Sequence, residues 1–116
     1  MPREESYPKA ARIRRRGEFL RLQREGRRRH TGHFVLIEQP TTRSLTRLGV
    51  TVSKRIGNAV IRNRVKRLLR EAFRRQRSNL HASRDLVLIA KPGAETLTYA
   101  QVATEFARAL DLDIRC

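Results

Sequence analysis

The longest amphipathic pattern in the chain runs from Asn58 to Arg77. Its apolar residues recur every three or four positions, which is the spacing of one face of an α-helix. These residues are Ile61, Val65, Leu68, Leu69 and Ala72, with Phe73 at the edge of the stripe. Asn58 follows Gly57 and can serve as an N-cap, and no proline interrupts the segment behind it. The pattern predicts one helix of about 20 residues, roughly 30 Å long, that packs by an apolar face.

Two shorter segments also have apolar residues at helical spacing. The first, residues 17–25, is followed by Gly26, and glycine is common just after a helix ends. In the second, Thr98 and Gln101 fit a capping box that opens a helix reaching to about Leu112. The apolar stripe of this last helix consists of Val102, Phe106, Ala109 and Leu110.

Three further segments have the patterns of β-strands. Residues 34–37 are apolar at successive positions, and residues 85–90 are nearly so, which is typical of buried strands. Residues 48–54 alternate instead. Their apolar side holds Leu48, Val50 and Val52, and the other side holds Gly49, Thr51 and Ser53. The small residues leave room for a ligand to lie across the sheet, although a solvent-facing surface is the simpler interpretation.

The order of the predicted elements is α-β-β-α-β-α, with a short extra strand possible. Helices and strands in this order, in a chain of 116 residues, predict a single-domain α/β (α+β) fold, an α-β sandwich with helices packed on a sheet. We expect this domain to span residues 17–116. Residues 1–16 are polar and basic, and we expect a disordered arm that is either an inert tail or becomes ordered on nucleic acid.

The charge of the chain is strongly positive and unevenly distributed. The formal net charge is +16 and the pI is about 11.7. Residues 54–77 hold ten Lys or Arg and one acid, Glu71, whereas residues 78–116 hold four basic and five acidic residues. Such basicity points first to nucleic acid and second to an anionic membrane surface. No apolar run is long enough to span a bilayer.

On a helical wheel, the cations of the central segment gather on a polar flank. This flank consists of Asn63, Lys66, Arg67, Arg70 and Arg74. Arg62 borders the apolar stripe, and Arg64 and Arg75 fall on the other side. The flank is either a solvated charged face or a polyanion site, and the charges favour the second because the like charges at 62, 66, 70 and 74 repel one another.

The sequence lacks the patterns of a catalytic centre. Metal-dependent nucleases usually need clustered carboxylates, and none appear on the predicted strands. His30 and His33 lack further ligands at metal spacing, so we expect no metal site. The single cysteine, Cys116, suits a free thiol in a reducing cytoplasm, and residues 1–16 lack a signal-peptide pattern. The chain therefore reads as a nucleic-acid binder. RNA is favoured over DNA because cations lie on more than one flank of the helix.

Residues 53–73, SKRIGNAVIRNRVKRLLREAF, closely resemble the protein subunit of bacterial ribonuclease P. The core of the match is Arg62-Asn63-Arg64, with cations on both sides of it. The resemblance extends from Gly17 through the last helix and covers roughly 95 residues. It implies that the central helix enters the sandwich through a left-handed β-α-β crossover, against the general preference for right-handed ones.

The resemblance also implies a function. The chain would be the protein subunit of an endoribonuclease in which a catalytic RNA removes the 5′ leader of precursor tRNA. The chemistry would depend on Mg²⁺ held mainly by the RNA, with no catalytic residue in the protein. The expected partners are that RNA and precursor tRNA, in a cytoplasmic 1:1 complex without DNA or membrane. The alternatives are a structural RNA-binding protein of ribosomal type and a DNA-binding regulator.

The resemblance carries over two sets of residues. The RNA-binding set is Lys54, Arg55, Asn58, Arg62, Asn63, Arg64, Lys66, Arg67, Arg70 and Arg74. The set expected in the leader cleft is Phe19, Phe34, Thr51, Ser53 and Lys54. The chain has Gln23 and Ile37 where the family often has aromatic residues, so we expect it to hold the leader by its phosphates more than by base stacking.

Overall fold

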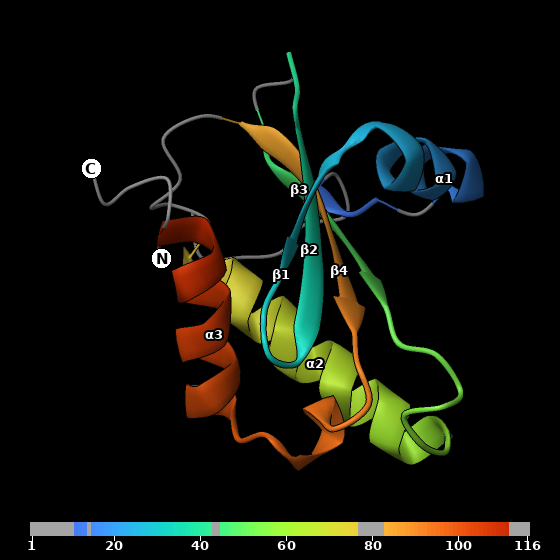
Figure 1. Cartoon of the computed structure of the whole chain (residues 1–116), viewed down its shortest axis with the longest axis vertical. Coiled ribbons are helices and arrows are strands. Elements are labelled where there is room, and N and C mark those ends of the chain that lie inside the picture. Colours follow the sequence, from blue (N-terminus) through green and yellow to red (C-terminus); the bar gives the residue numbers. More distant parts are fainter. Residues whose placement is uncertain (1–10, 14, 43–44, 77–82, 112–116) are drawn as a thin grey trace.

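The computed structural model describes residues 11–13, 15–42, 45–76 and 83–111. Most of the expected arm, residues 1–10 and 14, and the C-terminal residues 112–116, which include Cys116, lie outside these ranges. A four-stranded sheet forms the centre of the domain (Figure 1). The elements along the chain are α1 (Arg16–Glu25), β1 (Arg27–His30), β2 (Phe34–Pro40), β3 (Arg47–Thr51), α2 (Ala59–Gln76), β4 (Arg84–Ala90), the 3₁₀ turn η3 (Ala94–Thr96) and α3 (Tyr99–Asp111). The predicted order is confirmed, and β1 is the short extra strand.

The strands lie in the order β1-β2-β4-β3. β2 pairs antiparallel with both β1 and β4, whereas β3 and β4 are parallel neighbours joined through α2. A parallel pair needs such a crossover because its strands run in the same direction. The β-α-β unit of the prediction is therefore present, while its left hand stays a prediction.

Each face of the sheet has its own apolar core. On one face, Phe34, Leu36, Leu48, Leu86 and Leu88 pack against α2 and α3. The other face is covered by α1 (Figure 1). There Val35, Ile37 and Val87 pack against Leu22 and Phe19 of α1. Both faces of β2 and β4 are covered, which explains why these two strands are apolar at successive positions.

The helix ends form as their sequences predict. Asn58 Oδ1 accepts a hydrogen bond from the Ile61 backbone N–H at 3.0 Å, which caps the start of α2. At α3, the Thr98 backbone N–H donates to Gln101 Oε1 at 2.9 Å and the Gln101 backbone N–H donates to Thr98 Oγ1 at 3.2 Å. This reciprocal pair is the predicted capping box. Phe73, expected at the edge of the α2 stripe, is fully buried.

Residues 11–13 belong to the domain, so the boundary expected at Gly17 was wrong for this segment. Arg12 forms an isolated parallel bridge with Leu48, and the Ile13 backbone N–H donates to the Leu48 carbonyl at 2.9 Å. Ala11 is 0% exposed and Ile13 is 3% exposed. The segment adds to the outer edge of β3, which would otherwise present unpaired backbone groups.

A buried ion pair joins β3 to β4 where the two strands start. Arg47 Nε and Nη2 donate to the two carboxylate oxygens of Asp85 at 3.0 and 2.9 Å, and Arg47 Nη1 reaches Glu18 at 3.1 Å. The hydrogen bonds that Arg47 donates to Asp85 raise the pKa of Arg47. Asp85 therefore neutralises a structural arginine and is not available for the carboxylate cluster of a nuclease.

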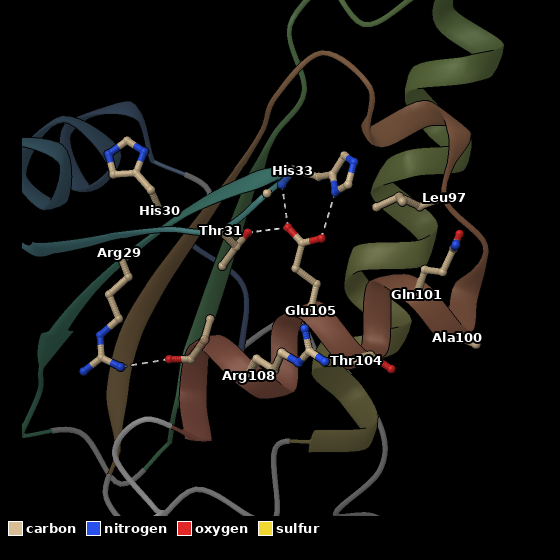
Figure 2. Close-up of a pocket in the computed structure, with 12 residues that line it drawn as sticks. Arg29, His30, Thr31, His33, Leu97, Ala100, Gln101, Thr104, Glu105 and Arg108 are labelled. Atoms are coloured by element: carbon tan, nitrogen blue, oxygen red, sulfur yellow. Dashed lines mark hydrogen bonds and ion pairs between the residues drawn. The ribbon is translucent and has the colours of Figure 1, made fainter.

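A cluster of hydrogen bonds ties the turn between β1 and β2 to α3 (Figure 2). Glu105 accepts from Thr31 Oγ1, from the His33 backbone N–H at 2.6 Å and pairs with His33 Nδ1 at 2.9 Å. Burial raises the pKa of Glu105, but the hydrogen bonds from Thr31 and His33 outweigh this effect, so the pKa of Glu105 lies below its ordinary value. Beside this cluster is a groove of about 680 Å³ between the turn and α3.

We expect Glu105→Gln to lower the free energy of unfolding by about 1 kcal/mol at neutral pH. Because folding lowers the pKa of Glu105, its contribution is present above the ordinary glutamate pKa and is lost as the pH falls through the folded-state pKa. Urea denaturation at neutral pH and at a series of pH values below the ordinary glutamate pKa of about 4.3 measures this. The control is Glu25→Gln, which removes an exposed carboxylate paired only at 3.8 Å. A Glu105→Gln difference that does not shrink as the pH falls would contradict the prediction.

Candidate RNA interface

The polar flank of α2 forms one wall of a cationic groove. The groove holds about 410 Å³ and is lined by Arg12, Asn63, Arg67, Arg70, Glu71 and Arg74. Four of these six residues are in the flank that the helical wheel predicts, so the structure brings Asn63, Arg67, Arg70 and Arg74 together. Lys66 is on the same helix and is half-buried. A groove with four guanidinium groups and one carboxylate suits a phosphate backbone.

Glu71, the single acid of α2, organises two of the neighbouring cations. Its carboxylate accepts from Arg74 Nε at 3.1 Å and from Arg75 Nε at 2.9 Å. The bond from Arg74, followed by the bond from Arg75, lowers the pKa of Glu71 to about 2. Glu71 is therefore ionised at neutral pH and holds Arg74 at the groove wall.

Arg12 lines the groove but is absent from the residues predicted to bind RNA. Arg12 reaches the groove because its backbone bridges to Leu48 at the edge of β3, next to α2. The local signal was the sequence Ala11-Arg12-Ile13, in which two buried apolar residues flank a basic one. Such alternation is typical of a short strand but is too brief to be detected within a basic arm.

The cations outside the flank face other parts of the domain. Arg64 donates to the backbone carbonyls of Glu95 at 3.1 Å and Leu97 at 3.2 Å, so its side chain points toward η3 and the start of α3. Arg75 lies 5.8 Å from the ring centre of Tyr99. Arg62 Nε donates to the Gly57 carbonyl at 3.1 Å. The helical wheel correctly placed Arg64 and Arg75 on the side of the helix away from the polar flank. Arg64, although predicted to bind RNA, does not line the groove.

The turn between β3 and α2 presents a second group of polar residues. The strand ends at Thr51, so Ser53 and Lys54 lie beyond it and not within it as expected. Both residues and the following Arg55 are exposed. The turn is anchored by the Ile56 backbone N–H, which donates to the Ser53 carbonyl at 3.1 Å. The two cations therefore project from a fixed turn between the sheet and the helix.

The α1 side of the sheet carries the small-residue surface where the leader cleft is expected. Phe19 covers Gly49, where an added Cβ would lie 2.5 Å from Phe19 Cζ, so the ring fills part of the small-residue surface. Thr51, further along β3, is half-buried on the same face. Strand pairing then places Ile89 beside Thr51 and Val35 beside Ile89. We refer to this row of residues, which crosses the sheet beside α1, as the candidate leader cleft.

Phe34 was wrongly assigned to the cleft. It is 1% exposed and packs in the core between the sheet and the helices α2 and α3, on the face opposite to Phe19. Ile37 lies on the cleft face but is fully buried under α1. Among the described aromatic residues, Phe19 alone lies on the cleft face, so stacking surface there is small.

Comparison with known proteins identifies the family. Residues 7–112 match the family model described as Ribonuclease P. The ribonuclease P protein component of Citrifermentans bemidjiense is 45% identical over 104 residues, which cover 90% of this chain and 89% of that protein.

Solved structures agree. The RNase P protein of Staphylococcus aureus superposes with a TM-score of 0.83 at 32% identity, covering 90% of this chain and 96% of that one. The RNase P protein from Thermotoga maritima gives a TM-score of 0.80 at 28% identity, covering 87% and 96%. The basic helix, the sheet and the sequence thus agree, and the chain belongs to the ribonuclease P protein family.

Proposed function

We propose that the α2 groove binds the catalytic RNA of ribonuclease P and that the cleft beside α1 holds the 5′ leader of precursor tRNA. Membership in the family makes the chain a subunit of an endoribonuclease that acts in tRNA 5′ processing. The main support for placing the catalytic RNA at α2, apart from the leader, is that Arg12, Arg67, Arg70 and Arg74 line one groove. Helix cations held in this way match the repeated phosphates of a folded RNA.

The turn that carries Lys54 and Arg55 lies between the two sites. It follows β3, which forms part of the cleft floor, and it precedes α2, which forms the groove wall. A single strand in the cleft would therefore pass these two cations where it approaches the catalytic RNA. This placement would orient the leader close to the scissile phosphate without supplying a catalytic group.

Magnesium chemistry fits the RNA better than this chain. Among the described residues, no three His, Cys, Asp or Glu side chains gather as a metal site. The buried acids Glu38 and Asp85 are each paired with arginine. The oxygen ligands that Mg²⁺ needs would therefore come mainly from RNA phosphates. We infer that the protein raises affinity and positions the substrate, and that it does so as a 1:1 complex in the cytoplasm.

The purely structural alternative is not favoured, because the relatives are components of a processing enzyme. Within the described residues, no helix has both the length and the apolar composition that crossing a bilayer requires.

Reconstitution tests the proposed function. The chain is combined with a bacterial ribonuclease P RNA and a precursor tRNA at low Mg²⁺, where RNA alone is slow. We expect the protein to restore cleavage at the mature 5′ end. Failure to restore cleavage would contradict the proposal. Cleavage by the protein alone would show that the catalytic groups lie in the protein and not in the RNA.

We expect leader binding to depend strongly on salt and weakly on base identity. Phe19 offers little stacking surface, so phosphate contacts dominate, and each such contact contributes about 0.7 to the slope of log affinity against log salt. Lys54→Ala should lower that slope by about 0.7. Titrations of holoenzyme with precursor tRNA at several salt concentrations measure it, and leaders of different base composition serve as the control. A shallow slope with clear base preference would argue for stacking instead.

A further inference from the structure

The basic segment Arg27–His30 divides its side chains between the two faces of the sheet. Paired residues of antiparallel strands present their side chains on the same face. Arg29 pairs with Leu36, on the face of α2 and α3, and there its Nη1 donates to the Ala109 carbonyl at 2.9 Å. Arg28 pairs with Ile37, and His30 pairs with Val35. Arg28 and His30 therefore belong to the face that carries the cleft.

His30 completes a row that crosses the whole sheet. The strand pairings place His30 beside Val35, Val35 beside Ile89, and Ile89 beside Thr51. Three interstrand spacings make this row about 14 Å long. The row starts at the strand that leads to Lys54 and ends at β1, the free edge of the sheet. Along this row Thr51 and Ile89 are half-buried, Val35 is 8% exposed and His30 is exposed, so a chain that enters at β3 and leaves over β1 would follow these residues beside α1.

Arg28 lies two residues before His30 on the same face of β1, at the end of α1, and is held in place. Its Nη2 donates to the Gln23 carbonyl in the last turn of α1 at 2.9 Å, which draws the guanidinium to the end of that helix. A guanidinium has five N–H donors, and this bond uses one. The side chain is exposed. The nearest acid along α1, Glu25, pairs with Arg24 at 3.8 Å.

We propose that Arg28, with His30 beside it, binds the phosphate backbone of leader nucleotides upstream of those held in the cleft. This inference rests on the proposed function, since it takes the leader as the occupant of the row from Thr51 to His30. The end at Lys54 lies next to the cationic groove of α2, so that end faces the catalytic RNA. The upstream end of the leader then leaves at β1. Arg28 extends the leader contact beyond the cleft.

Leader length gives the decisive measurement. Holoenzyme is assembled with the catalytic RNA, and affinities are measured for precursor tRNAs with leaders of about 4 and about 16 nucleotides, the range over which single-strand sites extend. We expect the unaltered protein to bind the long leader more tightly. Arg28→Ala should remove about three- to tenfold of the long-leader affinity and leave the short leader unchanged.

Arg27→Ala is the matched control. Arg27 is adjacent, exposed and equally charged, but it pairs with Glu38 and so lies on the other face of β1. Arg28→Lys should keep part of the extra affinity for the long leader because it keeps the positive charge. Equal losses in the Arg27 and Arg28 variants, or equal losses for both leaders, would overturn the exit site. So would an absence of any length effect in the unaltered protein.

The two proposals fail in different ways. If the unaltered holoenzyme cleaves the short-leader precursor but shows no gain with the long one, only the exit site is refuted. If protein addition restores no cleavage with either leader, the proposed function itself is refuted. A loss of thermal stability in Arg28→Ala without a change in length dependence would mean that Arg28 only caps α1, and would overturn the exit site as well.

Discussion

Leu69→Ala is expected to lower the free energy of unfolding by about 2–5 kcal/mol. Leu69 is 0% exposed and lies at the centre of the core between α2, α3 and the sheet. Its truncation removes buried apolar surface and leaves a cavity that rigid neighbours on both sides cannot fill. Urea denaturation followed by circular dichroism measures the change, provided that the dependence of stability on urea keeps its slope.

Leu20→Ala provides the matched control for this loss. The chemical change is identical, but Leu20 lies on the outer side of α1 and is 45% exposed. We expect it to cost well under about 1 kcal/mol. Similar losses at the two positions would mean that α2 is not packed by the stripe through Leu69. RNA binding by Leu69→Ala at low temperature, where it is still folded, should be preserved because the groove lies on the opposite side of the helix.

The features predicted correctly from the sequence are those that local rules specify. The limits of α2 follow from its apolar period and from the Asn58 cap, which acts within three residues of itself. The capping box of α3 is equally local. The flank Asn63, Arg67, Arg70 and Arg74 follows from helix geometry alone once the helix is identified.

The errors concern contacts between distant parts of the chain. Phe34 lies in a run of apolar residues, and such a run does not show which side chain faces which layer. Its face was decided by the packing of α3, far along the chain. Arg12 was missed for the same reason, because the bridge that places it involves Leu48. Pairing between distant residues leaves no trace in a local period.

The charge count also overstated the cations available to RNA. Arg47 is buried against Asp85, Arg84 is bound to Glu38, and Arg64 is hydrogen-bonded to two backbone carbonyls. A sequence shows how many charges are present but not which of them are paired inside the fold. The set of cations available to RNA is therefore smaller than the net charge suggests, and we propose that those in the groove and in the turn after β3 contribute most to RNA binding.

Arg67→Ala is expected to weaken binding of the catalytic RNA by about ten- to hundredfold, the value of one or two hydrogen bonds from a charged group to phosphate. Arg67 is exposed and lines the groove, so its loss should not unfold the domain. Binding of labelled RNA at several salt concentrations measures the affinity. The slope of log affinity against log salt should also fall by about 0.7–0.9.

Arg64→Ala tests whether position or charge alone determines this effect. The same charge is removed from the same helix, but the Arg64 side chain is directed to the Glu95 and Leu97 carbonyls and not into the groove. We expect Arg64→Ala to retain most of the RNA affinity while losing some thermal stability. A defined groove distinguishes two arginines of equal charge, whereas the overall charge of the helix does not. Equal loss of RNA affinity in both variants would therefore show that the helix binds RNA through its total charge and not through the groove. Unchanged affinity in Arg67→Ala would move the RNA site off this flank altogether.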